Sequence, residues 1–134
     1  MKSKATNINI QTSQVNIATL QRTTLFSESN WSDLKKSRLI ESILVGIPIG
    51  MIWINLEISK IIDGNKRLDA IRSFMTNEFP LQHLTFELPD LEGLFYYQMP
   101  PYLQRRIEET ILTVVKIQHG TPSTELKDII NRIK

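Results

Sequence analysis

The hydrophobic residues of this chain recur at two spacings, one typical of helices and one typical of strands. Apolar residues three or four positions apart predict amphipathic helices over residues 32–45 and 65–75. Ser32 is placed to cap the first helix, and Gly46 and Pro48 end it. The second helix carries its apolar stripe at Leu68, Ile71, Phe74 and Met75.

Strands are predicted where β-branched residues follow one another or alternate with polar ones. Residues 51–56 and 58–62 are two such segments, and residues 111–117 form a run typical of a buried strand. Residues 8–17 alternate weakly, which fits short strands or an extended loop.

The remaining segments complete an α+β pattern. Residues 80–97 mix apolar residues with proline and glycine, which predicts a loop with brief strands. The proline pair that opens residues 100–109 fits the first turn of a short helix. Thr121 and Pro122 are expected to begin a last helix, whose apolar positions are Leu126, Ile129, Ile130 and Ile133.

Composition restricts the class of protein without identifying it. A chain of 134 residues with 41% hydrophobic and 22% charged residues fits one folded domain. A net charge of +2 is compatible with nucleic acid but does not argue for it. The absence of cysteine excludes disulfides, thiolate metal sites and cysteine nucleophiles. The polar start and the interrupted apolar stretch at residues 43–54 predict a cytoplasmic protein without a membrane partner.

The segment with the most chemistry is residues 61–67, where a strand leads through Asp63 and Gly64 into a helix. Lys66 and Arg67 lie in the first helical turn, where the helix dipole favours negative rather than positive charge. A phosphate would satisfy these two side chains together with the free N–H groups of the turn. The alternative is an ordinary Asp-Gly turn with a solvated lysine and arginine, and the spacing alone leaves both open.

For the other candidate residues, a structural role explains their surroundings better than a functional one. His83 is expected in a partly exposed loop, and His119 near the end of a strand. Arg105 and Arg106 are followed by two glutamates and are expected on a solvated helix face. Aromatic side chains able to stack on a base are more typical of the core in such apolar surroundings; they are Trp53, Tyr96 and Tyr97.

Two motifs resemble the N-terminal domain of GmrSD-type restriction proteins, which belongs to the ParB/sulfiredoxin-like superfamily. They are residues 36–49, KSRLIESILVGIPI, and residues 61–68, IIDGNKRL. Residues 77–79, 103–107 and 129–133 agree with the same succession. The resemblance covers residues 17–134 as a single domain and leaves residues 1–16 as an N-terminal extension.

The resemblance implies a small mixed sheet with flanking helices and a turn that binds nucleotide phosphates. The family signature is Asp-Gly-Gln-Gln-Arg, which Asp63, Gly64 and Arg67 match. Family members are linked to hydrolysis of nucleoside triphosphates and to defence against phage DNA, usually with a separate nuclease domain. Gln21 and Arg22 resemble the family's upstream Gln-Arg pair, which tends to lie near the same pocket, and Trp31 resembles the tryptophan that follows it.

Several positions depart from the family pattern. Asn65 and Lys66 replace the two glutamines of the signature. These replacements disfavour the positioning of a hydrolytic water and are compatible with phosphate binding. The family usually continues past the position of Lys134, which implies either an excised domain or a short member. The two histidines of the chain have no metal-ligand spacing, so no nuclease site is expected in it.

Three hypotheses follow. The first is a nucleotide-binding, NTP-hydrolysing domain that uses Mg²⁺, with Asp63 and Arg67 as catalytic residues. Phosphate would be held by Gly64, Asn65, Lys66, Arg67 and Arg22, with Gln21 in the nucleotide pocket. The second hypothesis is a DNA-binding module of ParB type. The third is an inactive regulatory or interaction domain, and a separate nuclease partner is compatible with the first or the third.

Overall fold

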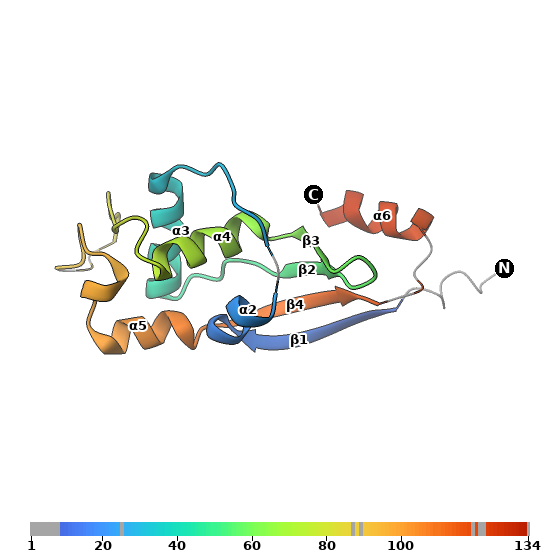
Figure 1. Cartoon of the computed structure of the whole chain (residues 1–134), viewed down its shortest axis with the longest axis horizontal. Coiled ribbons are helices and arrows are strands. Elements are labelled where there is room, and N and C mark those ends of the chain that lie inside the picture. The colour runs from blue at the N-terminus through green and yellow to red at the C-terminus, as the bar shows by residue number, and fades with distance from the viewer. Residues whose placement is uncertain are drawn as a thin grey trace.

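The computed structural model describes residues 9–24, 26–86, 88, 90–118, 120 and 123–133. They form a four-stranded sheet with helices, which confirms the predicted α+β class (Figure 1). The strands are β1 (Ile10–Asn16), β2 (Ile52–Asn55), β3 (Lys60–Asp63) and β4 (Ile111–Ile117). The helices are α2 (Ile17–Thr23), α3 (Asp33–Val45), α4 (Asn65–Met75), α5 (Pro101–Glu108) and α6 (Ser123–Ile133), with a 3₁₀ turn η1 (Tyr96–Gln98).

The sheet is mixed, and its strand order is β1-β4-β2-β3. Strand β4 lies at the centre, antiparallel to β1 and parallel to β2. Strand β3 returns antiparallel to β2, with an irregular register between Trp53 and Ile54. The central position of β4 explains its apolar run, because a strand with neighbours on both sides and covered faces buries most of its side chains; Leu112, Val114, Val115 and Ile117 are buried.

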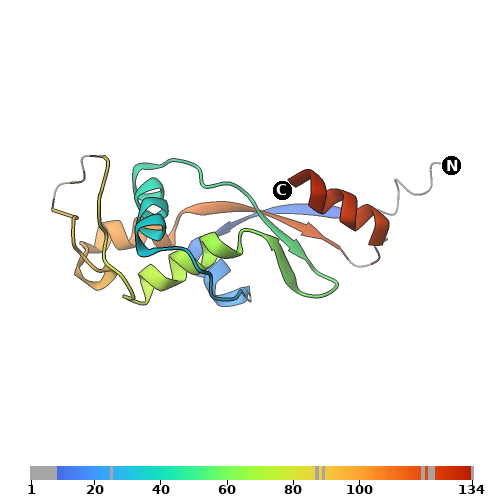
Figure 2. The same cartoon turned by 90° about the horizontal axis from the view of Figure 1, so that it is seen from above.

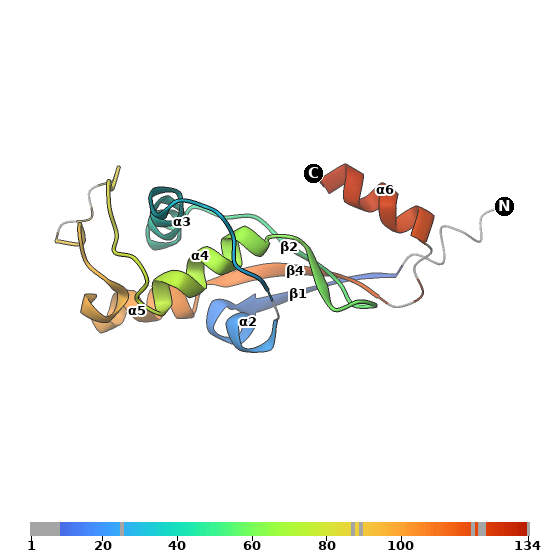
Figure 3. The same cartoon turned by 45° about the horizontal axis from the view of Figure 1, so that its top comes forward.

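The main core lies between one face of the sheet and helices α2 to α5. Leu112 and Val114 of β4 belong to it, together with Ile52 and Ile54 of β2. Val115 and Ile117 alternate with these residues, so they are on the opposite face, where they are also buried. Figures 2 and 3 show α3, α4 and α5 gathered at one end of the molecule, and α6 at the other end beside the strands.

The two long predicted helices are confirmed as α3 and α4. The Ser32 hydroxyl accepts a hydrogen bond from the backbone N–H of Lys35 at 3.2 Å, and Gly46 ends α3 with a φ of +86°. Helix α5 and the predicted strands are also present within a few residues of their expected bounds. The predicted start of the last helix at Thr121 and Pro122 lies outside the described residues.

Two segments differ from expectation. Helix α2 was not predicted, because its sequence IATLQRT is short and only Ile17 and Leu20 mark a buried face. In the described part of residues 80–95 no strand is present, although brief strands were expected. The Glu41 carboxylate accepts the N–H groups of Thr85 and Phe86 at 2.6 and 2.7 Å, so these groups are not free to pair with a strand.

The predicted exposure of single candidate residues is confirmed for some of them and wrong for Tyr97. His83 is exposed in a loop, and Arg105 and Arg106 are exposed on α5, as predicted. Tyr96 is half-buried, whereas Tyr97 is 66% exposed, so the prediction that Tyr97 belongs to the core was wrong. His119 lies outside the described residues. None of the helices in the described part of the chain has the length and apolarity that crossing a bilayer requires.

Candidate functional site

The predicted turn at Asp63 and Gly64 connects β3 directly to α4. Gly64 is the N-cap of α4 and has a φ of +114°, a conformation that favours glycine. A Cβ atom at this position would lie 2.5 Å from Cδ1 of Ile52, inside the core. Glycine is therefore required here both by the backbone conformation and by the packing beneath the turn.

A cavity of about 340 Å³ opens at the N-terminus of α4. Its lining consists of Trp31, Ile62, Asp63, Gly64, Asn65, Lys66 and Arg67. All five residues from Asp63 to Arg67 thus line one cavity. No side chain caps α4, so the N–H groups of its first turn lack the partner that a capping residue would supply.

Arg67 is fixed by two hydrogen bonds. Its Nη1 donates to the carbonyl oxygen of Ile49 at 2.7 Å, and its Nη2 donates to Oδ2 of Asp63 at 3.1 Å. The side chain is only 17% exposed. Its guanidinium group keeps further N–H donors beyond these two bonds. Arg67 is therefore an oriented donor at the cavity wall, and Asp63 offsets part of its charge.

Asn65 has a structural partner on the other side of the turn. Its Oδ1 accepts the backbone N–H of Ser27 at 2.8 Å, and its Nδ2 donates to the Ser27 carbonyl at 2.9 Å. The amide is engaged both as acceptor and as donor, so Asn65 offers a ligand its backbone N–H and the second hydrogen of Nδ2. Lys66 is exposed, and the described residues include no ion pair that uses it.

Gln21 and Arg22, the two residues expected near the pocket, do not line the cavity. Arg22 is exposed on α2 and folds back on its own helix, where Nη1 donates to the Ala18 carbonyl at 3.3 Å. Gln21 does reach α4, but its Nε2 donates to the carbonyl of Leu68 at 3.2 Å. The structure therefore brings Gln21 near the helix that carries the site and leaves Arg22 apart from it. Trp31, in contrast, is part of the cavity wall.

A buried carboxylate one turn along α4 was missed by the sequence reasoning. Asp69 accepts hydrogen bonds from the N–H and the hydroxyl of Ser29, and from Nη2 of Arg72 at 2.7 Å. Lys36 of α3 lies 3.5 Å away. Asp69 thereby fastens the segment that carries Trp31 onto α4. The four-residue spacing from Asn65 to Asp69 puts both residues on one helix face. This spacing is the sequence signal from which Asp69 could have been identified.

These partners decide the ionisation of Asp69. Burial raises the pKa of its carboxyl group, but hydrogen bonds from Arg72 and Ser29 and the charge of Lys36 outweigh burial and hold the pKa below its ordinary value of 3.8. Asp69 is thus a charged structural group near neutral pH.

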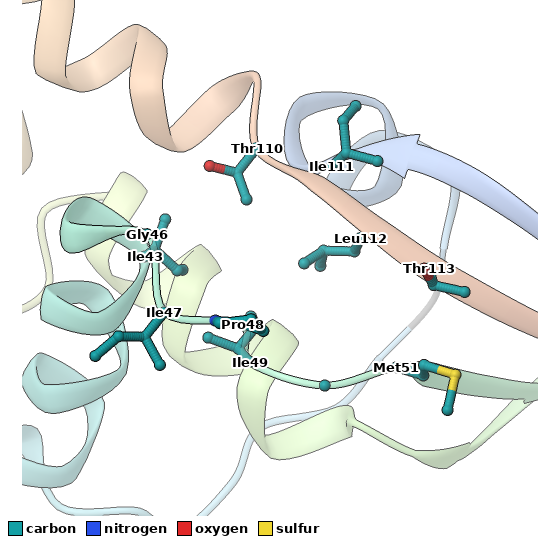
Figure 4. Close-up of a pocket in the computed structure, with 11 residues that line it drawn as sticks. Ile43, Gly46, Ile47, Pro48, Ile49, Met51, Thr110, Ile111, Leu112 and Thr113 are labelled. Atoms are coloured by element: carbon teal, nitrogen blue, oxygen red, sulfur yellow. The ribbon is translucent and has the colours of Figure 1, made fainter.

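A second hollow of about 380 Å³ is of a different kind. It lies between the segment after α3 and the beginning of β4, and the side chain of Leu112 extends into the gap (Figure 4). Its lining is Ile43, Gly46, Ile47, Pro48, Ile49, Gly50, Met51, Thr110, Ile111, Leu112 and Thr113. No charged side chain is among these residues, so this groove is not a phosphate site.

No group of three or more potential metal ligands is present within the described ranges. Asp63 is the residue in the lining of the α4 cavity that carries a carboxylate, the type of group that binds a divalent cation.

Comparisons with protein-family models, with curated proteins and with solved structures found no match to this chain. The likeness to GmrSD-type proteins stays a prediction that rests on the motifs of the sequence.

Proposed function

We propose that this chain is a phosphate-binding domain whose ligand is a nucleoside triphosphate with Mg²⁺. The observation that carries the proposal is that Asp63, Gly64, Asn65, Lys66 and Arg67 line one cavity at the uncapped N-terminus of α4. A helix of 11 residues directs its dipole and free N–H groups to this end, which favours an anion.

The charges at the cavity support the same ligand. Asp63 neutralises part of the Arg67 charge at 3.1 Å, and exposed Lys66 adds a second positive charge. Lys66 is the mobile donor and Arg67 the fixed one, so a phosphate would gain an oriented contact and an adaptable one. Both lie in the first turn of α4, where positive charge is unfavourable unless an anion is bound.

The size of the cavity suggests where a nucleotide would extend. A volume of about 340 Å³ is at the small end for ligand sites and suits the phosphates rather than a whole nucleotide. A neighbouring hollow of about 410 Å³ shares Asn65 with the cavity. It is lined by Phe26, Ser27, Ser59, Lys60, Ile61 and Asn65, which offer an aromatic ring, hydroxyls and an amine to the rest of the ligand.

The proposal concerns nucleotide binding, and hydrolysis is a separate question. Oδ2 of Asp63 is engaged by Arg67, which makes Asp63 a residue that positions Arg67. Its other carboxylate oxygen has no hydrogen bond within the described part of the chain and is the one group in the lining able to accept a proton from water. We infer the setting in a phage-defence system, with a separate nuclease partner, from the family resemblance alone.

A thermal-shift experiment tests the proposal. We expect millimolar ATP, GTP, CTP or UTP with Mg²⁺ to raise the Tm of the wild-type protein, since a ligand at a hundredfold excess over its Kd stabilises by about 2.7 kcal/mol. Lys66→Ala is the informative variant, because Lys66 is exposed and its removal should leave the fold unchanged. Arg105→Ala on α5 removes the same charge away from the cavity and is the matched control.

Lys66→Ala should reduce the shift, and Arg105→Ala should preserve it. No shift with any nucleotide, or equal shifts in the two variants, would overturn the proposal. A DNA duplex at low salt is the second arm of the experiment. Stabilisation by DNA without stabilisation by nucleotides would favour the ParB-type hypothesis.

A further inference from the structure

Strand β1 forms an open edge of the sheet. It pairs with β4 along its whole length, and among the described residues no strand pairs with its outer side (Figure 1). Two hydrogen bonds flank this ladder, from the N–H of Ile17 to Thr110 O at 2.9 Å and from the N–H of Gln118 to Asn9 O at 2.8 Å. They show which backbone groups of β1 point inward, because antiparallel pairs alternate between bonded and non-bonded.

The backbone N–H and C=O groups of residues 9 and 17 point toward β4, so those of the odd-numbered residues between them do the same. The even-numbered residues therefore direct their N–H and C=O groups outward, most clearly Thr12 and Gln14 in the middle of the strand. The side chains of Thr12 and Gln14 are exposed. The edge thus presents a row of free donors and acceptors to solvent.

Strand β1 itself, as far as the structure describes the chain, lacks the features that normally prevent pairing. The sequence of β1 is IQTSQVN, with no charged residue and no proline over seven residues. Protein sheets usually protect open edges with lysine, proline, bulges or short strands. The opposite edge is protected in this way, since β3 has only four residues, begins at exposed Lys60 and ends in the Asp63–Arg67 ion pair.

The edge is also complementary to itself. If a second copy lies antiparallel with the twofold axis at Ser13, Thr12 of each copy faces Gln14 of the other, and the outward groups of both residues meet. The two Ser13 residues then lie opposite each other on the same face. Ser13 Oγ is buried and has no hydrogen-bond partner among the described residues. Rotation of each Ser13 side chain toward the edge would bring the two hydroxyls together and supply that missing bond.

We propose that two copies of this chain pair through their β1 strands in antiparallel orientation, so that the two sheets join into one continuous sheet. The proposal is independent of the proposed nucleotide site, which lies at the opposite edge of the sheet, next to β3. A single strand pair is a small interface, so dimerisation should depend on concentration in the micromolar range.

Sedimentation velocity over a range of concentrations tests this proposal with two double variants. Thr12→Lys with Gln14→Lys places lysine opposite lysine at both facing pairs and should weaken the dimer by about tenfold or more. Thr12→Lys with Gln14→Glu places lysine opposite glutamate and should restore it. Both variants change the same exposed side chains, so circular dichroism should show the same fold in each.

Dimerisation of the wild-type protein that the lysine pair abolishes and the lysine–glutamate pair restores would support the proposed register. A wild-type monomer at every concentration would overturn the proposal. A dimer that the lysine pair leaves unchanged, or one that both variants weaken equally, would overturn it as well, because the interface would then lie elsewhere or have another register.

Discussion

Arg67 depends on a neighbour that makes no hydrogen bond with it. The guanidinium group reaches the Ile49 carbonyl by passing directly over Gly50, where a Cβ atom would lie 2.8 Å from Nη1. Gly50 also has a φ of +93°, which disfavours other residues. Glycine at position 50 therefore helps to orient the Arg67 side chain.

Gly50→Ala should destabilise the protein by about 2–3 kcal/mol, through the left-handed backbone and through loss of the charged hydrogen bond to Ile49. Urea denaturation measures this change. Gly46→Ala is the matched control, because Gly46 has a φ of +86° and nothing within 4 Å of its Cβ position. It should lose only about 1–2 kcal/mol from backbone strain. Equal losses in the two variants would show that the contact with Arg67 contributes nothing.

At the scale of elements, α4 organises the site from both of its sides. Its first residue, Asn65, binds the backbone of Ser27, and Asp69 one turn later binds Ser29. These bonds hold residues 26–31 along the helix, and Trp31 at the end of that segment reaches the cavity. The helix thus carries one wall of the cavity and holds the other wall in place.

Hydrogen exchange at Ser27 should report this attachment. The N–H of Ser27 donates to Oδ1 of Asn65, so it should be protected in the wild-type protein. Asn65→Ala removes both bonds and should speed exchange by about tenfold, since a hydrogen bond contributes about 1 kcal/mol. Asn65→Asp keeps the acceptor and should retain most of the protection. Fast exchange in the wild type would contradict the bond.

Local signals predicted the elements around the site well. The cap at Ser32, the glycine after α3 and the Asp-Gly turn before α4 are all encoded within a few residues, and each is present. Helix α2 was missed because its stability comes from burying Ile17 and Leu20 in a core made by distant segments. The strand order was beyond prediction for the same reason, since β4 pairs with β1 across most of the chain.

The candidate site was predictable only in part. Residues 63–67 are contiguous, so a turn before a helix was enough to bring them to one place. The contacts of Asn65 with Ser27 and of Arg67 with Ile49 join residues far apart in sequence. Such contacts depend on how loops cross the helices, which local patterns do not encode. The same holds for Arg22, whose bond to its own helix replaces the predicted place in the pocket.

For the molecule as a whole, one acidic cluster joins several segments without any disulfide. Asp69 contacts the loop before α3, Lys36 of α3 and Arg72 of its own helix. Arg72 in turn binds Glu78 after α4 at 2.9 Å. A hydrogen bond from Thr76 and the contact with Arg72 also lower the pKa of Glu78 below its ordinary value of 4.5. Both carboxylates are therefore more acidic in the folded protein than in the unfolded chain.

This cluster should make the protein sensitive to acid. Because the folded pKa of Asp69 is depressed, its contribution is complete above the ordinary value of 3.8 and is lost as pH falls through the lower folded value. Asp69→Asn should destabilise by about 2–3 kcal/mol at pH 7, with a smaller difference from wild type near pH 3, measured by urea denaturation at both pH values.

Asp128→Asn is the control for this measurement. Asp128 pairs with Arg132 on the exposed side of α6 at 2.9 Å, and its side chain is 63% exposed. Such a surface pair should contribute less than about 1 kcal/mol at either pH. If the difference between Asp69→Asn and the wild-type protein were the same at pH 3 and pH 7, the cluster would not account for the acid sensitivity.

The central position of β4 has a consequence for synthesis. Among the described strands, the one that joins β1 to β2 comes last in chain order, so this four-stranded sheet cannot be completed until residue 117 has left the ribosome. Until then β1 has neither of its edges paired and carries no charge to keep it apart from other nascent chains. The helices α3 and α4 can form early, whereas β1 must wait for a partner made about 100 residues later. Translation speed and chaperone supply should therefore affect the yield of folded protein.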